Sequence, residues 1–124
     1  MLYERILVGT DGSATATKAV DRALAVAKVT GAELTVLHVG SGSKGKAVLD
    51  DVVARFGDRG VTLHTLLESG DPAGLLAETA ERDGFDLLVV GNKGMTGAAR
   101  FFLGSVPNKI SHHARCSLMI VRTT

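Results

Sequence analysis

Apolar residues along the chain follow two alternating patterns. Short apolar runs are typical of buried strands, and longer stretches with apolar residues every three or four positions are typical of amphipathic helices. The short runs predict strands at residues 5–9, 33–39, 61–67, 86–90 and 117–122. The periodic stretches predict helices at residues 14–30, 47–56, 72–82 and 106–114. Because strands and helices alternate throughout, the pattern predicts an α/β fold with a parallel sheet and helices on both faces.

The predicted strands suit a single-domain, flavodoxin-like or Rossmann-like sheet with the order 3-2-1-4-5. In that order the connections of the first and fourth strands diverge, and a crevice forms at the carboxyl ends of these strands. The turn Gly9-Thr10-Asp11 follows the first strand, and a glycine-rich loop at residues 91–105 follows the fourth. We therefore expect Asp11 to lie beside the glycine loop.

The glycine-rich loop has the spacing G-x2-G-x9-G-S, which is formed by Gly91, Gly94, Gly104 and Ser105. Glycines allow backbone N–H groups to approach an anion closely. The helix predicted just after the loop adds unpaired N–H donors and the positive end of a helix dipole. The pattern therefore predicts a phosphate-binding loop between a buried strand and a helix.

The composition mainly excludes some classes of binding surface and of protein. The chain has 124 residues, of which 45% are hydrophobic and 22% charged, and this suits one globular domain over residues 1–124. The net charge is +1 and the aromatic residues are four Phe and one Tyr, which argues against a nucleic-acid-binding surface. No apolar run approaches the roughly 20 residues that span a bilayer, so we expect a cytoplasmic protein without a membrane segment.

Residues for catalysis or metal binding do not stand out in the sequence. The histidines lack metal-ligand spacing, and we expect them to be packed or solvent-facing: His38, His64, His112 and His113. The single cysteine, Cys116, is expected to be a small buried residue without a role. No nucleophile, base and orienting group form an arrangement that predicts strong catalysis.

Three segments together resemble the universal stress protein family. They are Val8-Gly9-Thr10-Asp11-Gly12-Ser13, Leu37-His38-Val39 and the glycine-rich loop. The resemblance covers essentially the whole chain, and the glycine spacing is similar to that of the family's ATP-binding branch. It implies a stress-response binding and regulatory module that holds an adenine nucleotide. The expected ligand is ATP, with or without Mg²⁺, and AMP and cyclic AMP are alternatives.

The resemblance also implies which residues contact the nucleotide. Asp11 and the backbone around Gly9 and Thr10 would contact adenosine, Val39 would help form the adenine slot, and Gly91 would lie near the ribose. The phosphates would be held by Gly94, Gly104, Ser105 and Val106. Members of the family commonly dimerise through the last strand, here residues 117–122, so the resemblance implies a homodimer.

Other interpretations remain open on the sequence. Residues 40–45, Gly-Ser-Gly-Ser-Lys-Gly, satisfy G-x-G-x-x-G, and Glu68 ends the next predicted strand, a pattern also typical of NAD-binding units. We expect this stretch instead to be a flexible, solvated connection. Within the family, the alternatives are a cyclic AMP sensor or buffer, a slow ATPase or autophosphorylating enzyme modified at a residue such as Ser105, and a nucleotide-free dimeric interaction module.

Overall fold

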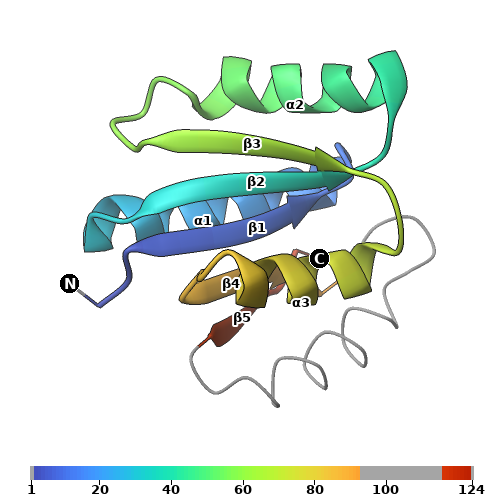
Figure 1. The fold of residues 1–124 in the computed structure, drawn as a ribbon. Coiled ribbons are helices and arrows are strands. Elements are labelled where there is room, and N and C mark those ends of the chain that lie inside the picture. Colours follow the sequence, from blue (N-terminus) through green and yellow to red (C-terminus); the bar gives the residue numbers. More distant parts are fainter. Residues whose placement is uncertain (1, 93–115, 124) are drawn as a thin grey trace.

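A parallel sheet with the strand order β3-β2-β1-β4-β5 forms the centre of the molecule (Figure 1). The structure is a computed structural model that describes residues 2–92 and 116–123. In chain order, the elements are β1 (Arg5–Thr10), α1 (Ala14–Thr30), β2 (Glu33–Val39), α2 (Gly42–Phe56), β3 (Leu63–Glu68), α3 (Pro72–Arg82), β4 (Leu87–Gly91) and β5 (Ser117–Val121). Every pairing between neighbouring strands is parallel. The predicted fold class and strand order are confirmed.

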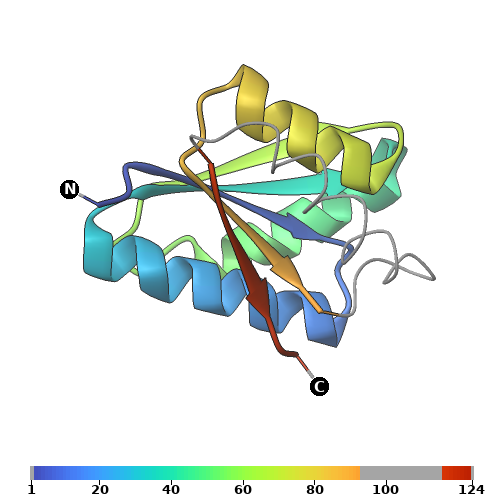
Figure 2. The same cartoon turned by 90° about the horizontal axis from the view of Figure 1, so that it is seen from below.

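Helices cover both faces of the sheet, as Figure 2 shows for α1 on one side and α3 on the other. Because side chains alternate along a strand, β1 supplies both layers of the core. Ile6 and Val8 pack with residues of α1 and α2, whereas Leu7 packs with residues of α3. These three side chains are fully buried. The central strands are therefore apolar on both faces, as expected of a covered parallel sheet.

Local signals define the ends of α1 and α3. The Ser13 hydroxyl caps α1 by accepting a hydrogen bond from the Ala16 amide at 3.1 Å, and Gly31 ends the helix with a left-handed φ of 76°. Asp71 caps α3 by accepting from the Gly74 amide at 2.8 Å, and Pro72 occupies the first turn. The predicted bounds of these two helices are confirmed.

The prediction of a flexible connection at residues 40–45 is wrong, because α2 begins at Gly42. Gly45 is buried in the first turn, where an added Cβ would lie 2.9 Å from Leu67 Cδ1 of β3. The glycine thus allows the helix to pack closely on the sheet, and this tertiary contact outweighs the low helix propensity of the stretch.

Other element bounds shift by a few residues or cannot be compared. β3 spans Leu63–Glu68, two residues later at its start than the predicted strand 61–67, and it forms one edge of the sheet as its partly exposed pattern predicts. β4 continues to Gly91, and β5 ends at Val121. The helix predicted at 106–114 and residues 93–105 of the glycine-rich loop lie outside the described residues.

Candidate functional site

The carboxyl ends of β1 and β4 lie next to each other at the centre of the sheet. The two strands pair in register through Val8 and Val89, so Thr10 and Gly91 each lie two residues farther toward the carboxyl edge. The chain continues from β1 through α1 to β2 on one side of this strand pair, whereas the strand that follows β4 in the chain, β5, lies on the other side. This divergence is the topological switch at which open α/β sheets bind ligands.

A tight turn, Thr10–Ser13, follows β1 and is fixed by its own hydrogen bonds. The Thr10 hydroxyl accepts from the Gly12 amide at 3.1 Å, and Asp11 Oδ1 accepts from the Ser13 amide at 2.9 Å. Gly12 has a φ of 83°, which glycine adopts without strain. Within the described part of the chain, Asp11 Oδ2 has no hydrogen-bond partner. The turn therefore presents a carboxylate oxygen in a fixed position at the switch.

The carboxyl end of β2 lies beside that of β1, on the side away from β4. Thr10 pairs with His38 in the β1–β2 register, and Val39 pairs with Glu68 in the β2–β3 register. Val39 is half-buried and packs against the core layer of α3. The structure thus brings Gly9, Thr10, Asp11 and Val39 to the carboxyl ends of two neighbouring strands, and their contacts with a nucleotide stay predictions.

No functional role is predicted for His38 from the sequence. It is buried, and its Nδ1 lies 2.8 Å from the Thr10 carbonyl oxygen. Of the two alternatives expected for the histidines, packed or solvent-facing, His38 is packed, and it packs directly against the turn that carries Asp11. Two sequence signals marked this position: a histidine in a mostly apolar strand, and its place in the family-like segment Leu37-His38-Val39.

The remaining predicted site residues lie in or after the glycine-rich loop. Gly91 ends β4 and is half-buried. The next residue, Asn92, is tied to the end of the chain, because its Oδ1 accepts from both the amide and the hydroxyl of Thr123 at 2.8 and 2.9 Å. Gly94, Gly104, Ser105 and Val106 lie outside the described residues, so their predicted contacts stay predictions.

A profile of the Universal stress protein family matches residues 2–51 and 41–122 of the chain. The chain belongs to the universal stress protein family. The predicted family is thereby confirmed.

Individual relatives agree with this assignment over nearly the full length. Universal stress protein YxiE of Bacillus subtilis is 30% identical over 148 residues, which cover 98% of this chain and all of YxiE. A solved universal stress protein in complex with cAMP is 35% identical, with a TM-score of 0.80 and 98% coverage of both chains. A family member from Burkholderia pseudomallei is 30% identical, with a TM-score of 0.71, and the match covers 97% of this chain and 96% of that one.

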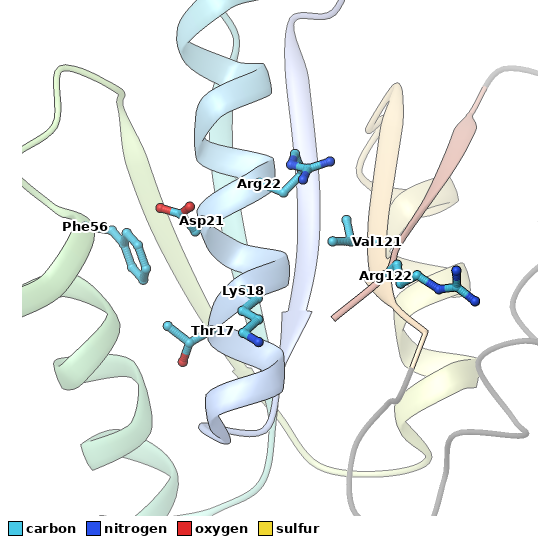
Figure 3. A pocket seen from close by; sticks show the side chains of 7 residues that line it. All are labelled: Thr17, Lys18, Asp21, Arg22, Phe56, Val121 and Arg122. Carbon is cyan, nitrogen blue, oxygen red and sulfur yellow. The ribbon is translucent and has the colours of Figure 1, made fainter. Parts of the chain in front are cut away.

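This universal stress protein also has a cavity of about 400 Å³ beside α1 (Figure 3). It is lined by Thr17, Lys18, Asp21, Arg22, Phe56, Val121 and Arg122, none of which is a predicted nucleotide contact. In Figure 3 the Asp21 carboxylate points toward Phe56, whereas the Arg122 guanidinium points away from α1. Lys18 Nζ donates to the Thr123 carbonyl oxygen at 3.2 Å. The charged groups of this cavity therefore do not converge on a common point.

Among the described residues, the other ionisable groups do not form a second candidate site. Among residues 2–92 and 116–123, no group of three or more His, Cys, Asp or Glu side chains could hold a metal ion. Burial raises the pKa of the Cys116 thiol, and the negative charge of Asp86 raises it further. No helix in these two segments is long and apolar enough to cross a membrane.

Proposed function

We propose that this universal stress protein binds an adenine nucleotide at the carboxyl ends of β2, β1 and β4 and acts as a binding and regulatory module in the stress response. The observation that carries the proposal is the turn Thr10–Ser13, which presents Asp11 Oδ2 at the topological switch. The solved relative in complex with cAMP, at 35% identity, supports the same ligand class.

In this proposal the adenosine lies against the described edge of the sheet. The backbone of Gly9 and Thr10 lines one side and Val39 lines the other. Asp11 Oδ2 accepts a hydrogen bond from a ribose hydroxyl, and the carboxylate stays in place because Oδ1 is held by the Ser13 amide. Gly91 lies near the ribose, and the phosphates are held by Gly94, Gly104, Ser105 and Val106.

The proposal has two candidate ligands, ATP and cyclic AMP, which differ in their phosphate groups. The glycine spacing favours ATP, because a long glycine loop with a following helix supplies many N–H donors to a polyphosphate. The cAMP complex of the 35% identical relative favours cyclic AMP. Cyclic AMP has a free 2′-hydroxyl but no free 3′-hydroxyl, so Asp11 would bind the 2′-hydroxyl in that case.

Calorimetric titration of ligand-free protein tests the proposal directly. Cyclic AMP, ATP with Mg²⁺ and AMP are titrated in parallel, with GTP and Mg²⁺ as the control for the base. We expect at least one adenine nucleotide to bind about tenfold or more tightly than GTP, since one unmatched buried polar group costs that much. If none of the adenine ligands produces heat or a thermal shift, the proposal fails.

We also infer that the protein forms a homodimer through residues 117–122. β5 is the edge strand of the described sheet, and its Ile120 side chain is 44% exposed. An edge strand with an exposed apolar side chain is suited to pairing with a second copy. Light scattering should give twice the chain mass for the wild type and a lower mass for Ile120→Lys. A monomeric wild type at high concentration would contradict the dimer and leave the nucleotide site intact.

A further inference from the structure

His38 lies between the two segments that would hold the adenosine. It is only 9% exposed, and its Nδ1 lies 2.8 Å from the carbonyl oxygen of Thr10. Because a carbonyl oxygen only accepts hydrogen bonds, Nδ1 must carry a hydrogen. The neutral ring is therefore held as the Nδ1–H tautomer, with an unprotonated Nε2. The histidine thus links the last residue of β1 to β2.

The other side of the ring contacts Gly40. A Cβ built on Gly40 would lie 2.7 Å from Nε2 and 3.2 Å from Cδ2 of His38, and the third nearest atom is also in this ring. Gly40 is not among the glycines with a positive φ, so its backbone would tolerate alanine. The Gly40 amide is anchored to β3 by a 2.8 Å hydrogen bond to the Glu68 carbonyl oxygen. The contact with His38 is therefore what excludes a side chain at this position.

The ring of His38 therefore contacts residues next to both Asp11 and Val39, the two residues between which the adenosine would bind. Asp11 directly follows the carbonyl that His38 holds, and Val39 lies between His38 and Gly40 in the chain. A shift of the ring would turn the Thr10–Asp11 peptide or move the start of the β2–α2 connection. We propose that His38 is a positioning residue that sets the separation between Asp11 and Val39, and thereby the fit of the adenine ring. This inference rests on the proposed function.

Single variants of His38 test the hydrogen bond to Thr10. His38→Leu removes the donor and replaces the ring with an apolar side chain, so we expect the Kd for the bound nucleotide to rise about fivefold to tenfold. His38→Asn places an amide nitrogen on Cγ, close to the position of Nδ1, and should recover most of this loss. His64→Asn is the matched control, because His64 is exposed on β3 and pairs with Glu33 at the surface. Its Kd should equal that of the wild type.

A double variant tests the contact with Gly40. Gly40→Ala alone should weaken binding by about tenfold, because the added methyl group displaces the imidazole. In His38→Asn/Gly40→Ala, the smaller amide leaves room for the methyl group, and the Kd should return to that of His38→Asn. Adenine selectivity, measured as the Kd ratio of GTP to the adenine nucleotide, should fall in the weak variants. A loss of global stability alone would not lower this ratio in a folded protein.

The outcomes separate this inference from the proposed function. No binding of any adenine nucleotide by the wild type would overturn the proposed function and, with it, the role of His38. Wild-type binding with an unchanged Kd in His38→Leu would overturn the role of His38 alone. If the double variant binds the nucleotide as weakly as Gly40→Ala does, contact with the ring is not the cause of the weaker binding. Nitrogen NMR of the ligand-free protein must also show the Nδ1–H tautomer for His38.

Discussion

Asp86 lies where the strands of the sheet begin, here called the amino edge, and Asp11 lies where they end, the carboxyl edge. The two carboxylates form different hydrogen bonds. Asp86 precedes β4 at the amino edge, where Oδ2 accepts from the Glu4 amide at 2.9 Å and Oδ1 from the Arg5 amide at 3.2 Å. Asp11 follows β1 at the carboxyl edge, where only Oδ1 accepts from a described backbone amide, at 2.9 Å. One carboxylate is fully engaged in joining two segments, whereas the other keeps an oxygen available.

The surroundings of the two aspartates extend this difference. At the amino edge, the Arg5 guanidinium donates to the Asp83 carbonyl oxygen and lies 4.5 Å from the centre of the Phe85 ring. At the carboxyl edge, hydrogen bonds shape the turn and hold Asn92. The side chains at the amino edge thus stabilise the fold, whereas those at the carboxyl edge hold polar groups in fixed positions. Substitutions at the two edges should therefore change different measured quantities.

The largest effect is expected from Gly104→Asp in the loop that follows β4. The prediction rests on the glycine spacing, since an acidic side chain at a phosphate-binding glycine blocks backbone approach and repels the phosphate. We expect nucleotide affinity to fall on the order of a hundredfold or more, with an unchanged melting temperature. Gly60→Asp, in the turn before β3, is the control and should leave the Kd unchanged. Wild-type affinity in Gly104→Asp would remove the phosphate role from this loop.

At the amino edge we expect a substitution to lower stability without changing nucleotide affinity. Asp86→Ala leaves the Glu4 and Arg5 amides without their side-chain acceptor, so the free energy of unfolding should fall by about 1–2 kcal/mol. The Kd for the nucleotide should not change, because Asp86 lies at the far edge of the sheet. Urea unfolding and calorimetry measure the two quantities on the same samples. A weaker Kd in folded Asp86→Ala would break the proposed separation of the two edges.

A smaller effect is expected from Asp11→Asn, which keeps Oδ1 for the Ser13 amide but replaces Oδ2 with a donor. The amide group can no longer accept from a ribose hydroxyl, so we expect about a tenfold loss of affinity. The free energy of unfolding should stay within about 0.5 kcal/mol of the wild type, because the turn keeps its hydrogen bond. Asp21→Asn, an exposed aspartate of α1, controls for the lost charge. Equal losses in both variants would indicate a long-range charge effect instead of a contact.

The sequence predicted the helices and strands that meet at both edges because their signals are local. Ser13 and Gly31 define α1, Asp71 and Pro72 start α3, and the apolar runs define the central strands. The switch between β1 and β4 then follows from the strand order. Local patterns also predicted that Asp11 directly follows the first strand, and the structure has it there.

Contacts between distant residues could not be predicted in this way. The bond from His38 to Thr10 joins residues 28 positions apart and depends on the register of two strands. The first turn of α2 looked flexible because it is rich in glycine, and only the close packing of Gly45 on Leu67 explains why it is helical. The part of the site beyond Asn92 is still a prediction from glycine spacing and family resemblance.

The smallest effect is expected at Cys116, which adjoins the amino edge. The next amide, that of Ser117, donates to the Asp86 carbonyl oxygen at 3.0 Å. Burial and the charge of Asp86 raise the pKa of the thiol, so less thiolate is present at neutral pH than in a free thiol. Iodoacetamide should therefore alkylate Cys116 more slowly than glutathione at pH 7.5, with the rate rising only at higher pH.

The sign of the stability effect follows from the same shift in pKa. Folding favours the protonated thiol, so this contribution is fully present below the ordinary thiol pKa and is lost as the pH rises through the raised value. Asp86→Asn should bring part of the alkylation profile back toward that of glutathione, whereas Asp11→Asn should not move it. Mass spectrometry of timed reactions measures both profiles. A shift in Asp11→Asn would mean that the two edges are electrostatically coupled, against the separation drawn from their hydrogen bonds.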